Sequence, residues 1–86
     1  MDGLRDQEIL AGIRTETKVI APDLDLSQLD PNAYIADVGI NSMQTLELVA
    51  RLEDRFGVAL PDYELAGVDS VADLIRVVSR ASTEAG

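Results

Sequence analysis

The chain has 86 residues, 16 of them acidic and 7 basic, which gives a formal net charge of −9 at pH 7. A surface this acidic argues against nucleic acid and anionic membranes as partners and favours basic patches on other proteins. The chain contains no histidine and no cysteine, which excludes a Ser-His-Asp triad, a Cys-His pair and the usual zinc sites. We therefore expect a non-catalytic protein without a bound metal.

The composition indicates one small domain over residues 1–86. Hydrophobic residues make up 47% of the chain but aromatic residues only 3%, so the core must be aliphatic, which suits packed helices. No signal peptide is visible at the N-terminus, and no apolar stretch is long enough to span a bilayer. We expect a cytoplasmic monomer.

The first helical pattern covers residues 4–20. Apolar side chains recur there at roughly helical spacing: Ile9, Leu10, Ile13 and Ile20. Gly12 weakens this helix by up to about 1 kcal/mol relative to Ala, and Pro22 ends it.

A connection of about twenty residues follows, over residues 21–41, and connections of this length are usually functional or locally packed. Its apolar anchors are expected to lie along the bundle: Leu24, Leu26, Leu29 and Tyr34. Asp30-Pro31-Asn32 predicts a turn.

Residues 42–56 give the strongest helical pattern. The expected inward stripe consists of Met43, Leu46, Val49, Ala50, Leu52 and Phe56. Glu47 and Arg51 stand at i and i+4, where they are expected to pair. Either Asn41 or Ser42 is expected to cap the helix start, and Gly57 to end it.

The rest of the chain predicts one short helical turn at residues 61–65 and a last helix. Ser70 and Asp73 have the spacing of a capping box at the start of that helix. Its inward residues are Val71, Leu74, Ile75 and Val78, and residues 81–86 are expected to form a frayed tail. No convincing strand is found. The fold class is therefore all-α, a small antiparallel four-helix bundle of three main helices and one short helix.

Ser42 is the leading candidate for a modified residue. A serine at a helix start is exposed, and a phosphate ester attached there lies at the positive end of the helix dipole. Physical chemistry alone leaves an alternative open, in which Ser42 is only a helix cap.

The stretch Asp37-Val38-Gly39-Ile40-Asn41-Ser42-Met43 resembles the motif that opens the second helix of the acyl carrier protein family. The resemblance continues downstream through residues 45–49, 52–58 and 60–61. Asn41 stands where the family usually has Asp, and Met43 where Leu is usual.

The resemblance implies a carrier with a covalent 4′-phosphopantetheine arm on Ser42, installed from coenzyme A by a separate phosphopantetheinyl transferase. The arm would hold acyl cargo as a thioester in fatty-acid or polyketide-type biosynthesis. Implied partners also include acyl-loading, ketosynthase and acyltransferase-type enzymes with basic docking patches. The implied docking residues are Asn41, Met43, Glu47, Glu53 and Asp54.

The sequence leaves two alternatives open. The cargo can be aminoacyl or peptidyl instead of acyl, or the chain can be an unmodified helical interaction module in which Ser42 is only a cap. Arg51 and Arg55 interrupt the acidic face of the helix and can tune partner choice by repelling an unsuitable basic partner.

Overall fold

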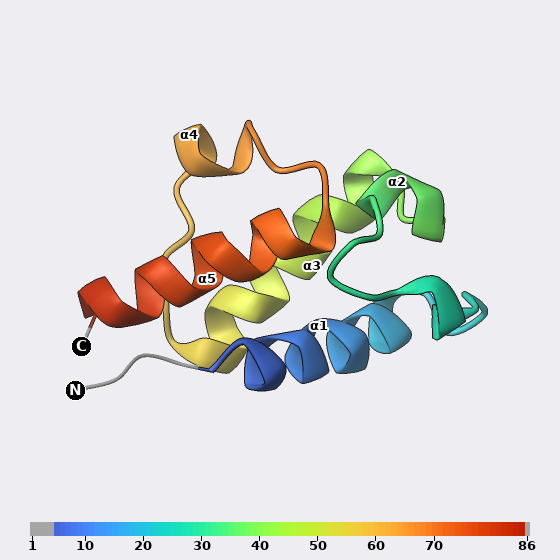
Figure 1. The fold of residues 1–86 in the computed structure, drawn as a ribbon, viewed down its shortest axis with the longest axis horizontal. Coiled ribbons are helices and arrows are strands. Elements are labelled where there is room, and N and C mark those ends of the chain that lie inside the picture. The colour runs from blue at the N-terminus through green and yellow to red at the C-terminus, as the bar shows by residue number, and fades with distance from the viewer. Residues whose placement is uncertain (1–4, 86) are drawn as a thin grey trace.

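Three helices of 15 residues each form the frame of the protein in a computed structural model that describes residues 5–85. They are α1 (Asp6–Ile20), α3 (Ser42–Phe56) and α5 (Val71–Ala85). Two short helices, α2 (Ile35–Val38) and α4 (Asp62–Leu65), and one 3₁₀ turn, η1 (Leu26–Gln28), lie in the connections. Helix α1 packs against α3 and α5, and α4 lies on α5 (Figure 1). No strand occurs within residues 5–85, so the predicted all-α bundle is confirmed.

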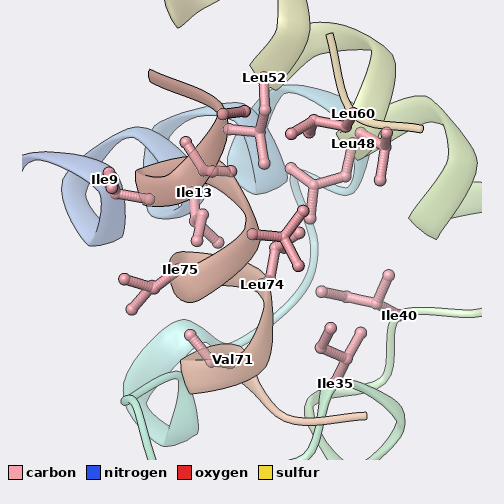
Figure 2. Close-up of a cluster of buried hydrophobic side chains, with 14 of the residues drawn as sticks. Ile9, Ile13, Ile35, Ile40, Leu48, Leu52, Leu60, Val71, Leu74 and Ile75 are labelled. Atoms are coloured by element: carbon pink, nitrogen blue, oxygen red, sulfur yellow. The ribbon is translucent and has the colours of Figure 1, made fainter. Parts of the chain in front are cut away.

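The core is aliphatic, as the composition predicts. Side chains from all three long helices meet in it, together with residues from the connections (Figure 2). Its fully buried larger side chains are Ile9, Ile13, Leu29, Leu48, Leu52, Leu74, Val71 and Val78. Burial of each such side chain contributes about 1.5–3 kcal/mol, so these residues supply most of the drive to fold.

Helix α1 begins at Asp6, and the predicted start at Leu4 lies outside the described residues. The helix ends at Ile20, directly before the Ala21-Pro22 step, as predicted. Gly12 lies where the Phe56 side chain of α3 packs against α1. A Cβ atom at this position would lie 2.5 Å from Cζ of Phe56, so the missing side chain lets α1 approach α3 closely.

The long connection is more ordered than its pattern suggests, because it contains both η1 and α2. Leu29 is fully buried, as predicted, and the turn after Asp30 is confirmed by a hydrogen bond from the Ala33 amide to the Asp30 carbonyl (3.0 Å). Tyr34 was expected to be an anchor, which is wrong: 58% of it is exposed. Its backbone pairs with Ser70 in an isolated bridge, while the aromatic side chain remains in contact with solvent.

Helix α5 starts with the predicted capping box. The Asp73 amide donates to Oγ of Ser70 (3.1 Å), and the Ser70 amide donates to Oδ2 of Asp73 (3.2 Å). The four predicted inward residues of this helix are all buried. The frayed tail over residues 81–86 is wrong up to Ala85, because α5 continues to that residue and buries Ala81 against the core. Gly86 lies outside the described residues.

Residues 5–85 contain neither a membrane-spanning helix nor a cluster of metal-ligating side chains. None of the helices is long and apolar enough to cross a membrane. No group of three or more His, Cys, Asp or Glu side chains is arranged to hold a metal ion.

The Thr17 hydroxyl is fully buried and has no hydrogen-bond partner among the described residues, 5–85. Thr17→Val removes this unsatisfied group and keeps the branched shape, so it should raise the free energy of unfolding by about 1 kcal/mol. Urea unfolding followed by circular dichroism measures the change. Thr15→Val, at an exposed position of the same helix, is the matched control and should change stability by less than about 0.5 kcal/mol. A loss of stability in Thr17→Val would contradict the burial argument.

Candidate functional site

Ser42 is the first residue of α3 and is exposed. The cap of the helix is its neighbour Asn41, whose Oδ1 accepts a hydrogen bond from the Gln44 amide (2.8 Å). Gln44 completes a capping box, because its Oε1 accepts from the Asn41 amide (3.1 Å). Within residues 5–85 the Ser42 hydroxyl takes part in no hydrogen bond. The alternative that gives Ser42 the capping role is therefore wrong, since Asn41 holds that role.

The turn before Ser42 is fixed by one glycine and one buried side chain. Gly39 ends α2 with φ of 105°, a left-handed conformation that other residues rarely adopt. A Cβ atom on Gly39 would also lie 2.9 Å from Cδ2 of Leu24, so Leu24 packs directly on this turn. The next residue, Ile40, points into the core and is only 5% exposed. With Ile40 held inside and Asn41 bound as a cap, the chain presents Ser42 to solvent.

Two connected apolar grooves lie beside Ser42. The first, of about 380 Å³, is lined by Ser42 itself together with Ile35, Ala36, Ile40, Thr45, Leu46, Val68 and Asp69. The second, of about 280 Å³, runs between α3 and α4 and is lined by Ile35, Thr45, Leu46, Val49, Asp62, Leu65, Ala66, Val68 and Leu74. The four residues they share join them: Ile35, Thr45, Leu46 and Val68. Together they form an aliphatic passage from the Ser42 side of the molecule toward its core.

The outward face of α3 carries apolar residues that the sequence placed in the core. Met43 is 72% exposed, Leu46 is 68% exposed and Ala50 is exposed as well, so their predicted inward positions are wrong. Leu48, which was not assigned to the stripe, is fully buried. The helix buries a narrower face than helical spacing alone suggests.

The predicted docking residues on α3 differ in their surroundings. Asn41, Met43, Glu47 and Asp54 are all exposed near or along the same outward face. Glu53 is half-buried, and its Oε2 accepts a hydrogen bond from the Leu60 amide (2.8 Å). Glu53 therefore also fixes the connection between α3 and α4, a role that sequence reasoning missed.

An ion-pair cluster around the buried Glu16 joins α1 to the edge of α3 that faces it. Glu16 is only 8% exposed. Its Oε1 accepts a hydrogen bond from Nε of Arg51 (2.6 Å), and its Oε2 accepts one from Nη1 of Arg55 (3.0 Å). Two hydrogen bonds, of which that from Arg51 has the larger effect and that from Arg55 the smaller, hold the pKa of the Glu16 carboxyl below its usual value. The predicted pairing of Glu47 with Arg51 is wrong, because Glu16 is the residue that binds Arg51. Thirty-five residues separate Glu16 from Arg51, so no local pattern reveals the pair.

Comparison with known families gives a match over most of the chain. Residues 7–78 match the family model described as "Phosphopantetheine attachment site". The meromycolate extension acyl carrier protein of Mycolicibacterium aurum is 29% identical over 79 residues, which cover 91% of this chain and 80% of that protein. Its counterpart from Mycobacterium tuberculosis strain H37Rv is also 29% identical over 79 residues, covering 91% of this chain and 68% of the relative.

Solved structures show the same fold. The crystal structure of an acyl carrier protein from Thermotoga maritima has a TM-score of 0.85 at 23% identity and covers 94% of both chains. The acetyl-donor carrier bound to the HMG synthase of the curacin pathway has a TM-score of 0.77 at 26% identity, over 90% of this chain and 99% of that one. The acetyl actinorhodin acyl carrier protein of Streptomyces coelicolor has a TM-score of 0.73 at 29% identity, over 90% and 93%.

The capping geometry predicts different costs for neighbouring substitutions. Asn41→Ala leaves the Gln44 amide without its partner and should lower the free energy of unfolding by about 1 kcal/mol. Asn41→Asp keeps an acceptor and should retain most of the stability. Ser42→Ala removes a hydroxyl that makes no hydrogen bond to the part of the chain that the structure describes, so it should change stability by less than about 0.5 kcal/mol. Urea unfolding of the three variants checks this order, and a cost for Ser42→Ala equal to that of Asn41→Ala would contradict it.

The Glu16 cluster predicts a pH-dependent contribution to stability. Because the pKa of Glu16 is lowered in the folded state, its carboxylate stabilises the fold above about pH 4.5, the usual value. This contribution is lost as the pH falls through the lowered pKa. The wild type should therefore exceed Glu16→Gln in stability at pH 7, and the difference should shrink toward pH 3.

Urea unfolding at several pH values measures this difference. Glu47→Gln is the control, because it removes an exposed carboxylate that forms no ion pair within residues 5–85. Its curve should run parallel to that of the wild type. A constant gap between wild type and Glu16→Gln from pH 7 to pH 3 would show that the carboxylate charge is not what stabilises the cluster.

Proposed function

This chain belongs to the acyl carrier protein family, whose members bear a phosphopantetheine attachment site, and we propose that it carries acyl chains on Ser42 for fatty-acid or polyketide-type biosynthesis. As a member of the family it is a non-catalytic carrier, and its cofactor is a covalently attached 4′-phosphopantetheine. When attached, this group supplies the thiol that holds cargo as a thioester, a thiol that a chain without cysteine lacks.

The free Ser42 hydroxyl is the observation that supports this assignment most. It is exposed at the start of a 15-residue helix whose first turn contains no acidic residue. The positive end of the helix dipole and the first backbone amides, which have no partner within the helix, favour a phosphodiester at this position. The site therefore fits the group electrostatically and leaves the acceptor oxygen accessible to a phosphopantetheinyl transferase.

The aliphatic passage beside Ser42 supports acyl cargo over aminoacyl or peptidyl cargo. Leu46, Val49 and Leu65 line it between α3 and α4, and within the described residues its charged lining is limited to Asp62 and Asp69. Binding of an apolar acyl chain in this passage is favourable, because apolar surface of both the chain and the passage is removed from water. The similar proteins include carriers named for meromycolate extension and for actinorhodin, so they leave fatty-acid and polyketide-type cargo equally open.

We further propose that partner enzymes dock on α3 around Ser42. The exposed side chains of Asn41, Met43, Glu47 and Asp54 lie nearest to such a partner, and Glu53 contributes from the side of α4. Exposed apolar Met43 beside exposed acids suits a partner with an apolar pocket and basic residues around it. The carrier in the curacin pathway was solved in complex with an HMG synthase, a precedent for docking of this kind. The single domain over residues 1–86, the cytoplasmic location and the monomeric state stay predictions.

Intact-mass spectrometry tests the attachment site. Co-expression with a broad-specificity phosphopantetheinyl transferase should raise the mass of the wild type by one phosphopantetheine unit. Ser42→Ala should show no increase while keeping its helical circular dichroism spectrum. Ser27→Ala, which removes another exposed serine, should be modified like the wild type. An increase in Ser42→Ala, or none in the wild type with several transferases, would overturn the proposal.

A further inference from the structure

The exposed surface of α3 divides into a ridge and two edges. Met43, Glu47, Ala50 and Asp54 follow at alternating intervals of four and three residues, so they form one outward ridge. One edge carries Leu46, which lines the grooves toward α4. The opposite edge faces α1 and carries the two arginines bound by Glu16.

We call Arg51 and Arg55 the basic edge of α3. The side chains of Arg51 and Arg55 remain 45% and 40% exposed, whereas the Glu16 side chain between them is only 10% exposed. Two positive charges against one carboxylate leave the cluster with a net charge of +1, in a chain whose total is −9. The three paired groups are therefore locally positive on an acidic protein, and Asp54 of the ridge lines the same groove beside them.

The basic edge is also held in place. Glu16 fixes one nitrogen of each guanidinium group, and Arg55 in addition lies 5.9 Å from the ring centre of Phe56. The remaining N–H groups of both arginines have no hydrogen-bond partner within residues 5–85 and border a shallow groove of about 400 Å³. Because the side chains are already ordered, a carboxylate that binds there causes little further loss of side-chain entropy.

An enzyme that modifies Ser42 must come close to this edge. Arg51 follows Ser42 by nine residues, which corresponds to about 14 Å along the helix axis. A standard protein interface covers about 800 Å² on each partner, a patch roughly 30 Å across. Nine residues are also about two and a half turns, so Arg51 does not share the side of α3 that carries Ser42. Arg51 instead adjoins the ridge, where it lines one groove together with Ala50 and Asp54. A partner that contacts the Ser42 hydroxyl and covers the ridge therefore has the basic edge at its margin.

We propose that the basic edge is a specificity determinant: it selects partner enzymes whose docking surface places a carboxylate opposite Arg51 and Arg55 and disfavours partners whose surface is uniformly basic. Glu47 and Asp54 on the ridge still attract basic residues, so the preferred docking surface carries both charges in register with α3. Like charges brought together at an interface reduce the association rate and the affinity, and this is the source of the discrimination. The inference rests on the proposed docking of enzymes around Ser42.

The first experiment uses a phosphopantetheinyl transferase chosen for a docking patch with Lys and Arg and without Asp or Glu. The double variant Arg51→Gln/Arg55→Gln should be modified with a kcat/KM about three- to tenfold above that of the wild type, because the repulsion is removed. The gain should disappear in about 0.5 M salt, where exposed charges are screened. Glutamine at both positions can still donate to Glu16, which limits the loss of stability.

Two control variants separate charge from structure. Glu16→Gln loosens the cluster but keeps both positive charges, so its kcat/KM should not rise above the wild type. Arg76→Gln removes an exposed arginine of α5 that lies in a groove between α4 and α5, so it should match the wild type. A rise in kcat/KM for Glu16→Gln equal to that of the double variant would show that mobility, not charge, controls recognition.

The second experiment tests the preference for a carboxylate directly. Basic residues of the transferase patch are changed to Glu one at a time, and each variant is assayed with wild-type carrier and with the double Gln variant. At one or more positions the wild-type carrier should become the better substrate, which reverses the order seen with the unmodified transferase. Unchanged order at every position, or equal rates for both carriers throughout, would overturn the proposal.

The end-point mass separates failure of the proposed function from failure of the basic-edge proposal. If the wild type never gains a phosphopantetheine unit, the proposed function fails. If every carrier variant is fully modified at rates that do not depend on Arg51 and Arg55, the proposed function stands and the basic edge is only structural.

Discussion

The reciprocal hydrogen bonds between Asn41 and Gln44 are the interaction on which the site depends. They satisfy one orphan amide at the start of α3 and the amide of the cap residue itself, so the Ser42 hydroxyl is left without a structural role. The left-handed turn at Gly39 and the buried side chain of Ile40 set the direction from which the chain enters this cap. An accessible serine hydroxyl at a positive helix end is thus a consequence of how its neighbours are bound.

Different faces of helix α3 pack in the core, line the passage beside Ser42 and form ion pairs with α1. Leu48 and Leu52 hold the helix in the core, Leu46 lines the passage toward α4, and the arginines reach across to Glu16 on α1. What remains exposed is a ridge of apolar and acidic residues that leads away from Ser42. A helix of 15 residues therefore supports the fold, borders the passage beside Ser42 and carries the surface on which we propose that enzymes dock.

Local chemistry made much of this predictable from the sequence. The bounds of α3, the glycine that ends it and the capping box of α5 depend on residues within one turn of each other, and all are confirmed. The outward positions of Met43 and Leu46 could not be predicted, because helical spacing does not distinguish apolar residues of the core from apolar residues that remain exposed. The Glu16 cluster was missed for a different reason, since its members come together only when α1 packs on α3. The residues whose positions differ from the prediction thus lie mainly on the exposed surface of α3, where we propose that partners dock.

The central claim is that the phosphopantetheine arm is attached to the hydroxyl of Ser42 and to no other side chain. Fragmentation mass spectrometry of proteolytic peptides from the modified protein tests it most directly, because it assigns the added group to a residue. The account predicts the group on Ser42 alone, with Ser27 in the same tryptic peptide unmodified. Assignment of the group to Ser27, Ser70 or any other residue would contradict it.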